Sequence, residues 1–205
     1  MIDPMTPRER RLVLLRHGET EWARLGRHTS TTEVPLTERG AAQARAVGAQ
    51  LTELALDDPL VVTSPRRRAH VTATLAGLTH DRHWDALTEW DYGEFEGLTT
   101  PEIREQVPHW TVWTHPCPGG ETHEMVGSRA DMVVHTAEAA LADRDVVLVG
   151  HGHFMRAVIA RWVELPVTEG RRFLLDPAAH TVLSYEHGFR TIRAHNVTRE
   201  KASSE

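Results

Sequence analysis

Four consecutive apolar residues, Leu12–Leu15, run directly into Arg16, His17 and Gly18, and no other segment constrains the fold of this chain as strongly. A short apolar run with a charged flank on its N-terminal side is typical of a strand buried on both faces of a parallel sheet. Open α/β sheets bind their ligands beyond the carboxyl ends of the strands. We therefore interpret His17 as the candidate reactive centre and Arg16 as its anion-binding partner.

Similar apolar runs recur along the chain and alternate with segments of helical spacing. This alternation predicts an α/β fold, a three-layer α/β/α sandwich whose central sheet is mostly parallel and has one antiparallel edge strand from a closing hairpin. For a short helix near residue 100, Thr100 is the expected N-cap and Pro101 the first helical residue. The other expected strands are 60–63, 84–87, 146–149, 181–185 and 191–194, and the other expected helices are 41–55, 65–78, 124–141 and 152–163.

Length and composition suit one globular domain over residues 1–205, with the irregular stretch 108–121 as a lid or insertion. The net charge is 23 − 29 = −6, so we do not expect a general nucleic-acid binder, which would carry a basic surface. No apolar stretch approaches the roughly 18 residues of a membrane helix. Residues 1–10 lack the apolar segment of a signal peptide. The expected location is the cytoplasm, with no nucleic-acid or membrane partner.

Arginine or histidine residues follow three of the predicted strands, the first of which is followed by Arg16 and His17. Arg66–Arg68 follow the second strand, His151 follows a later one, and the loop 89–97 supplies carboxylates. Arginine forks match phosphate oxygens in pairs, and helix N-termini add backbone N–H donors. A neutral histidine nitrogen can attack phosphorus to form a phosphohistidine, while a carboxylic acid protonates the leaving alcohol. The pattern therefore predicts a site for a phosphate ester.

The segment Leu15–Thr20 resembles the signature of the histidine phosphatase superfamily, the phosphoglycerate mutase-like clan. Further blocks resemble those of the family in the same order, and together they span residues 12 to about 165. Because four blocks occur in order, the resemblance is specific. The further blocks are Ser64–Ala69 with Thr72 and Ala73, Glu89–Gly97, and Val149–Gly152, and Pro118–Glu121 resembles another family segment.

The resemblance implies a phosphoglycerate mutase-like fold and a covalent phosphohistidine mechanism at His17. It implies that the phosphate pocket is formed by Arg16, Arg68 and His151, and that Glu89 is the general acid. It also implies that no metal or other cofactor takes part. The expected partner is a small-molecule phosphate ester, and the sequence leaves a homodimer open.

The resemblance extends to candidate contacts around the phosphate. Thr20, His28, Tyr92 and Gly152 are the candidate phosphate- or substrate-binding residues. For Tyr92, simple packing is the alternative to a contact with a substrate hydroxyl. His153 is expected to pack behind the site rather than to contact substrate.

The chain departs from the family pattern at two positions in the loop after the first strand. Ala23 stands where many members have asparagine, and Ser30 stands where many have glycine. Both positions lie near the substrate pocket of the family, which implies altered substrate contacts with the central transfer unchanged. His28 lies in the same loop and is the candidate replacement donor.

Within the clan, the alternative activity is that of a cofactor-dependent phosphoglycerate mutase. Such mutases usually carry a longer insertion after the acid loop, whereas here about twenty residues separate Gly97 from Gly119. The comparison favours a phosphatase. The chain resembles the broad-specificity acid phosphatases and the sugar-bisphosphate phosphatases of the clan most.

Two further classes of function remain open on the sequence. The pattern His151-X-His153 suggests a metal-dependent hydrolase, although a zinc site needs three or four ligands. A non-catalytic module that binds phosphorylated ligands is the other alternative, but such a module would have no need of the acid Glu89.

Other residues near these blocks are expected to have ordinary structural roles. Trp110 and Trp113 lie three apart and are expected to form a packed helix face. The charged residues expected to be solvated are Arg66, Arg67, Glu94 and Glu96.

Overall fold

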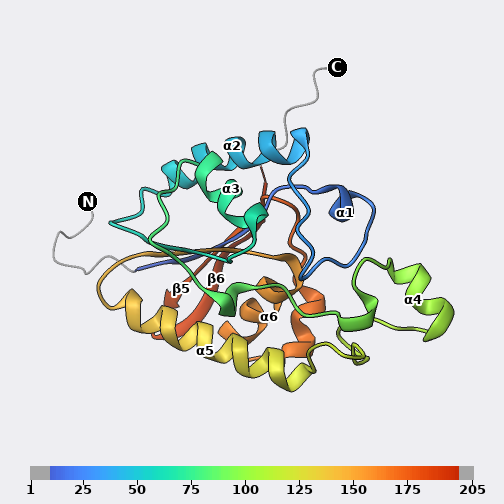
Figure 1. Ribbon diagram of the computed structural model, residues 1–205. Coiled ribbons are helices and arrows are strands. Elements are labelled where there is room, and N and C mark those ends of the chain that lie inside the picture. Colours follow the sequence, from blue (N-terminus) through green and yellow to red (C-terminus); the bar gives the residue numbers. More distant parts are fainter. Residues whose placement is uncertain (1–9, 199–205) are drawn as a thin grey trace, which may run out of the picture.

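The computed structural model describes residues 10–198, so the expectation that residues 1–10 lack a signal peptide falls almost wholly outside the described part. Within it, six strands form one sheet in the order β3-β2-β4-β1-β5-β6 (Figure 1). The strands are β1 Leu12–Arg16, β2 Leu60–Thr63, β3 Arg82–His83, β4 Val146–Gly150, β5 His180–Glu186 and β6 Phe189–Val197.

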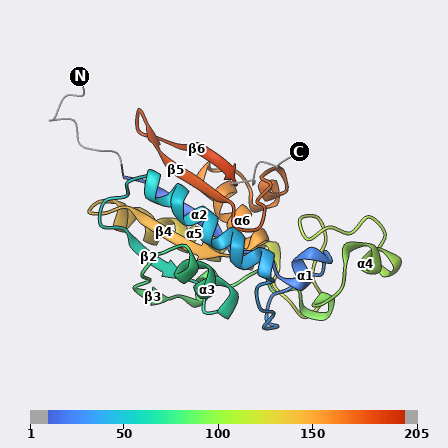
Figure 2. The same ribbon diagram turned by 90° about the horizontal axis from the view of Figure 1, so that it is seen from above.

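The sheet is mostly parallel, as the sequence predicts. β1 pairs in parallel with β4, β4 with β2, and β2 with β3. The antiparallel edge is the hairpin of β5 and β6, in which β5 pairs with β1 (Figure 2). His187 and Gly188 connect the two strands with φ of 52° and 83°. Positive φ at both central residues is the geometry that a two-residue hairpin turn requires.

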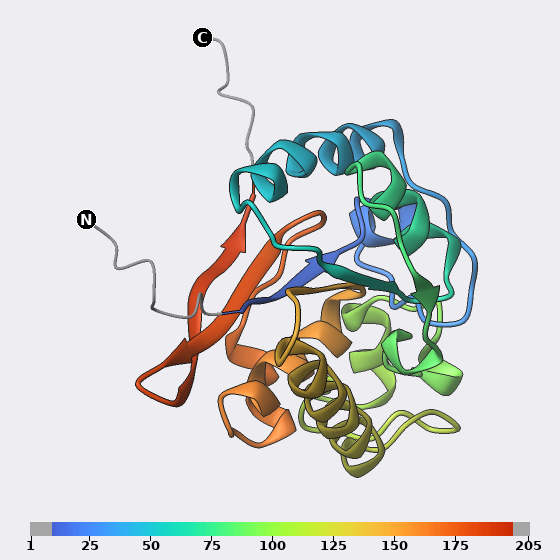
Figure 3. The ribbon, with the colours of Figure 1, turned by 90° about the vertical axis from the view of Figure 1, so that its left-hand side faces the viewer.

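Helices cover both faces of the sheet and complete the three layers (Figure 3). One core cluster packs α2 and α3 against one face, and the other packs α5 and α6 against the opposite face. Shorter helices, α1 and α4, lie beyond the carboxyl ends of the parallel strands (Figure 1). The helices are α1 Glu21–Arg24, α2 Glu38–Glu53, α3 Arg67–Leu75, α4 Thr100–Gln106, α5 His123–Leu141 and α6 Gly152–Trp162.

Strand β1 is buried on both faces, which confirms the interpretation of its apolar run. Val13 and Leu15 belong to the core with α2 and α3, whereas Leu12 and Leu14 belong to the core with α5 and α6. All four side chains are fully buried. Because each such burial contributes about 1.5–3 kcal/mol, a central strand with no polar face is stable only between two helical layers.

Three expectations about local structure are wrong. The strand expected at 84–87 is a 3₁₀ turn over Asp85–Leu87, preceded by the two-residue strand β3. Trp84 N donates to Thr63 O, and Leu87 N then donates to Trp84 O and closes the turn. The apolar side chains of this segment are therefore buried without any further strand pairing.

The N-cap of helix α4 lies one residue earlier than expected, and the helix begins at Thr100. Thr99 is the N-cap, because its hydroxyl accepts from Glu102 N while the Glu102 carboxylate accepts from Thr99 N. This reciprocal capping box satisfies two otherwise free backbone donors. Pro101 is consequently the second helical residue.

The stretch 108–121 is irregular, as expected, but it contains no packed helix face. Trp110 and Trp113 lie in turns rather than in a helix, and both are buried in the core beneath the sheet. Trp113 packs edge-on against Trp90. A lid role for this stretch stays a prediction. No helix among residues 10–198 has the length and apolarity of a membrane span.

Candidate active site

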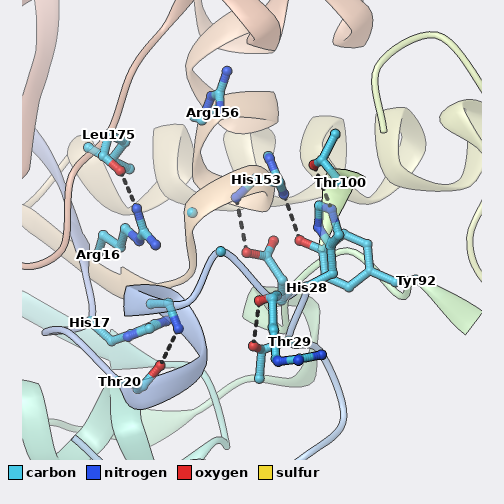
Figure 4. A pocket seen from close by; sticks show the side chains of 15 residues that line it. Arg16, His17, Thr20, His28, Thr29, Tyr92, Thr100, His153, Arg156 and Leu175 are labelled. Atoms are coloured by element: carbon cyan, nitrogen blue, oxygen red, sulfur yellow. Dashed lines mark hydrogen bonds between the residues drawn. The ribbon is translucent and has the colours of Figure 1, made fainter. Parts of the chain in front are cut away.

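A cavity of about 260 Å³ opens beyond the carboxyl ends of β1 and β4, where the sequence predicts the chemistry (Figure 4). Its walls come from the loop after β1, the acid loop, the start of α6 and the loop before β5. The lining residues are Arg16, His17, Thr20, Ala23, Gly26, Arg27, His28, Thr29, Glu89, Tyr92, Thr100, Gly152, His153, Arg156 and Leu175.

His17 follows β1 directly and has one defined tautomer. Its Nδ1 lies 2.7 Å from Gly18 O, and because a carbonyl oxygen only accepts, Nδ1 carries the proton. Nε2 therefore has a free lone pair. Burial, aided by the positive charges of Arg68 and Arg16, holds the pKa of His17 well below its usual value. The ring is thus neutral and can act as a nucleophile.

Gly18 allows the loop that carries His17 to approach helix α2 closely. A Cβ atom at Gly18 would lie 2.4 Å from Gly40 O. Gly18 N also donates to Thr72 Oγ1 at 3.0 Å. These contacts hold the peptide whose carbonyl sets the His17 tautomer, so the glycine of the first block has a steric reason.

Arg16 keeps free donors beside His17. Its Nη1 donates to Leu175 O at 2.6 Å, but its buried Nε has no hydrogen-bond partner among residues 10–198. The guanidinium lies over Gly152, where an added Cβ would come within 3.2 Å of it. A buried donor without a partner is costly, so this geometry suits an anion in the cavity.

Arg68 is buried next to the cavity but does not line it. Its Nη1 donates to Thr32 O at 2.9 Å, and its Nη2 donates to Ser30 O at 3.0 Å and Thr29 O at 3.3 Å. Its Nε donates to His151 Nδ1 at 3.3 Å. Most donors of Arg68 are therefore spent on the loop 29–32 and on His151, and its contact with phosphate stays a prediction.

His151 lies beside the nucleophile, with its ring centroid 5.2 Å from that of His17. Its Nδ1 accepts from Arg68, since arginine can only donate. In the neutral ring the proton is then on Nε2, which donates to Ser64 Oγ at 2.7 Å. Both ring nitrogens are thus engaged with protein groups, so His151 orders the floor of the site. Its role as a phosphate ligand stays a prediction.

Glu89 lies in the loop 89–97 and lines the cavity, where its carboxylate is bound by the N-terminus of α6. Oε1 accepts from Trp90 N at 2.9 Å and from Phe154 N at 2.7 Å, and Oε2 accepts from His153 N at 3.0 Å. Helix N-termini favour negative groups because their first N–H donors are unpaired. The structure therefore brings together Arg16, His17 and Glu89, which the sequence analysis assigned to the same reaction.

A positioning residue that the sequence analysis missed is Arg129 on α5. Its Nε and Nη2 form a two-point ion pair with Glu121 at 2.9 and 2.6 Å. The same guanidinium donates to three carbonyl oxygens of residues 86–89 at 2.8–3.4 Å and stacks on Phe154. The segment Pro118–Glu121 thus has a structural role, because it anchors the clamp on the acid loop.

Replacing Arg129 with methionine is expected to lower the free energy of unfolding by about 3–5 kcal/mol, because the half-buried Glu121 carboxylate loses its partner. Urea unfolding measures this change. The control Arg161→Met breaks a more exposed pair with Asp131 and is expected to cost less than about 1 kcal/mol. Equal losses in the two variants would contradict the role of Arg129 as a clamp.

The expectation that both outer carboxylates of the acid loop are solvated is half wrong. Glu94 is exposed, as expected, but Glu96 is half-buried. Its carboxylate accepts from Ser30 N at 2.8 and 3.0 Å and from Thr32 N at 3.0 Å. Glu96 and Arg68 therefore hold the N–H and C=O groups of the same loop. Local sequence carries no signal for this pairing.

The four further binding candidates all line the cavity. Thr20 also caps α1, with Oγ1 accepting from Ala23 N at 3.1 Å, and Gly152 begins α6. His28 Nε2 lies 3.3 Å from Thr100 Oγ1, and Tyr92 is buried. Their contacts with substrate stay predictions.

Among the lining residues that the sequence analysis did not assign to substrate, three carry basic side chains. His153 was expected behind the site, and Arg27 and Arg156 were not considered. Arg156 follows Gly152 by four residues, so the helical period places both on one face of α6. That spacing is the signal in the sequence that could have identified Arg156.

Buried neutral histidines make the stability of this site depend on pH. Burial lowers the pKa of His28 to about 4, from an unfolded value of about 6.5. Below pH 6.5 the unfolded chain therefore binds a proton that the folded chain refuses. The stabilisation is present above pH 6.5 and is lost as the pH falls toward 4. The pKa values of His17, His151 and His153 are lowered in the same direction.

His28→Gln is expected to reduce this acid sensitivity. Between pH 7 and 5 the free energy of unfolding of the wild type should fall by about 2 kcal/mol more than that of the variant. Urea titrations at the two pH values measure the difference. An identical fall in both proteins would show that His28 is protonated in the folded state.

Among residues 10–198, no group of three or more histidine, cysteine, aspartate or glutamate side chains is arranged to hold a metal ion. Phosphate release in the presence of EDTA tests the metal-dependent alternative.

Comparison with known proteins yields one family. The model of the histidine phosphatase superfamily (branch 1) matches residues 12–198. An acid phosphatase of Mycobacterium tuberculosis is 54% identical over 194 residues, covering 95% of this chain and 96% of the relative. A sedoheptulose 1,7-bisphosphatase of Saccharomyces cerevisiae is 30% identical over 80% of this chain and 70% of its own length. A solved Mycobacterium tuberculosis structure superposes with a TM-score of 0.91, at 54% identity over 92% of this chain and 98% of that one.

Proposed function

This chain belongs to the histidine phosphatase superfamily and is a phosphatase, and we propose that it hydrolyses small phosphate monoesters of the cytoplasm through a phosphohistidine on His17. The observation that carries the mechanism is that one cavity holds two groups without hydrogen-bond partners among residues 10–198. The free lone pair of His17 Nε2 and the unpaired Nε of Arg16 belong to side chains that line the same cavity.

The reaction proceeds in two displacements. In the first, His17 Nε2 bonds to phosphorus as the bond to the ester oxygen breaks, and protonated Glu89 gives its proton to the leaving alcohol. In the second, water attacks the phosphohistidine while the Glu89 carboxylate takes its proton, which regenerates His17 and releases inorganic phosphate. Arg16 and the α6 N-terminus stabilise charge on the transferred group.

The charges of the cavity support a dianionic substrate. Arg16, Arg27 and Arg156 outnumber the single carboxylate of Glu89, although the whole chain carries a net charge of −6. A local excess of arginine therefore attracts phosphate against the overall charge. The names of the relatives, an acid phosphatase and a sugar bisphosphatase, support phosphorylated sugars and related small esters as the substrate class.

The test is release of inorganic phosphate from glucose 6-phosphate, fructose 1,6-bisphosphate, 3-phosphoglycerate and p-nitrophenyl phosphate. Hydrolysis that is unaffected by EDTA is the expected result, and loss of activity with EDTA would support the metal-dependent alternative. Isomerisation of 3-phosphoglycerate that needs a bisphosphate activator, without net phosphate release, would support the mutase. Binding of the esters without turnover would support a non-catalytic module.

A further inference from the structure

We propose that His153 is a specificity-determining residue that donates a hydrogen bond from Nε2 to an oxygen of the leaving group. The site then prefers phosphate esters whose leaving group carries a hydroxyl next to the ester carbon over esters of plain alcohols. This inference rests on the proposed phosphatase activity and goes beyond it, because it assigns a residue to the choice of alcohol.

The contact with Tyr92 sets the tautomer of His153. Its Nδ1 lies 2.6 Å from the hydroxyl of Tyr92, which is buried and has no other hydrogen-bond partner among the described residues. A buried phenol must place its proton on an acceptor, so Tyr92 donates to Nδ1. In the neutral imidazole the ring proton is then on Nε2.

The ring of His153 is held rigidly by its surroundings. The backbone N–H of His153 donates to Glu89 Oε2 at 3.0 Å, which fixes the residue at the start of α6 (Figure 4). The ring stacks on His28 with centroids 5.8 Å apart and meets Trp113 edge-on at 5.4 Å. A donor held in place by three side chains loses little entropy on binding, so it can discriminate between ligands.

The ring of His153 carries no charge. Burial, aided by the positive charge of Arg156, lowers the pKa of His153 well below its usual value. The ring is therefore a neutral donor at working pH. A neutral donor suits a hydroxyl oxygen, whereas the phosphoryl group itself is matched by the cationic Arg16.

His153 lies next to the proposed general acid. Glu89, the proposed donor to the ester oxygen, bonds the backbone of His153 directly. Because His153 is next to that carboxylate on the cavity wall, its ring meets the atoms of the leaving group that are adjacent to the ester oxygen. Arg27, Arg156 and Thr100 line the same cavity and add further polar groups, which suits an alcohol rich in oxygen.

The experiment compares two esters with the same carbon skeleton, glycerol 1-phosphate and propyl phosphate. The measured quantity is the ratio of their kcat/KM values. The wild type is expected to favour glycerol 1-phosphate, and His153→Phe to lower the ratio about tenfold, the value of one hydrogen bond between neutral groups. His153→Gln, whose amide reaches the position of Nε2, should keep most of the preference, and His153→Asn should lose it.

Two controls make the result decisive. Tyr92→Phe frees Nδ1 and is expected to lower the ratio, but by less than His153→Phe. His135→Gln, at an exposed position of α5, is expected to leave both rates unchanged. An equal fall for both esters in His153→Phe would indicate a structural role and overturn the proposal, as would an unchanged ratio. If the wild type hydrolyses neither ester nor any of the panel above, the proposed function itself fails.

Discussion

Alanine in place of His17 is expected to reduce phosphate release by at least about 10³-fold, because the phosphorus then has no protein nucleophile to attack it. Arg16 and the α6 N-terminus remain in the variant. They could still bind phosphate, so inorganic phosphate should continue to bind although turnover is lost. The variant keeps β1 intact, since the strand is held by Leu12–Leu15 and not by His17.

The measurement has two parts. A mixing experiment with a ³²P-labelled ester, quenched in alkali, should trap an acid-labile phosphoenzyme in the wild type and none in His17→Ala. His135→Ala, at an exposed position on α5, is the matched histidine control and should retain full labelling. Near-normal activity of a folded His17→Ala protein, with labelling at another residue, would contradict the mechanism.

Glu89→Gln is expected to lower kcat for propyl phosphate by about 10²–10⁴-fold, the usual contribution of a general acid. An amide cannot supply a proton to the departing propoxide. With its amide oxygen accepting from Trp90 N and Phe154 N, its NH₂ group faces the N–H donor of His153, so one of the three hydrogen bonds of the carboxylate is lost. The variant should therefore be less stable as well as less active.

A comparison of leaving groups separates the two effects. p-Nitrophenolate departs without a proton, so kcat/KM for p-nitrophenyl phosphate, which reports only the first displacement, should fall far less than kcat/KM for propyl phosphate. Both rates are measured on the same preparation, with urea unfolding to determine the loss of stability. Equal falls for the two esters would indicate that Glu89 acts only by ordering the N-terminus of α6, and another group would have to be the acid.

Local patterns in the sequence predicted much of this molecule. The alternation of apolar runs with helical segments predicted the ends of β1, β2, β4, β5 and β6 to within three residues. Parallel strands have their carboxyl ends at one edge of the sheet, so polar residues after several strands had to converge there. That rule predicted that Arg16 and His17 lie at the ligand-binding edge of the sheet, whereas Glu89 was assigned to the same site because the loop 89–97 resembles the acid loop of the family.

The sequence predicted less well wherever a backbone or side-chain group could form its hydrogen bonds with more than one partner. The segment 84–87 is compatible with either a strand or a turn, and the hydrogen bond from Leu87 N to Trp84 O closes it into a turn. Glu96 has the surroundings of a solvated loop residue, yet it binds the N–H groups of Ser30 and Thr32.

What the sequence by itself determined is which residues are candidates for the reaction, because residue type, position at a strand end and similarity to family motifs are local properties. The tertiary structure alone decided how those groups are employed. Arg68 spends its donors on the loop 29–32, His151 is bonded through both nitrogens, and Arg129 anchors the acid loop. These hydrogen bonds join residues 8 to 87 positions apart, and a buried donor takes whichever acceptor the folded chain brings to it.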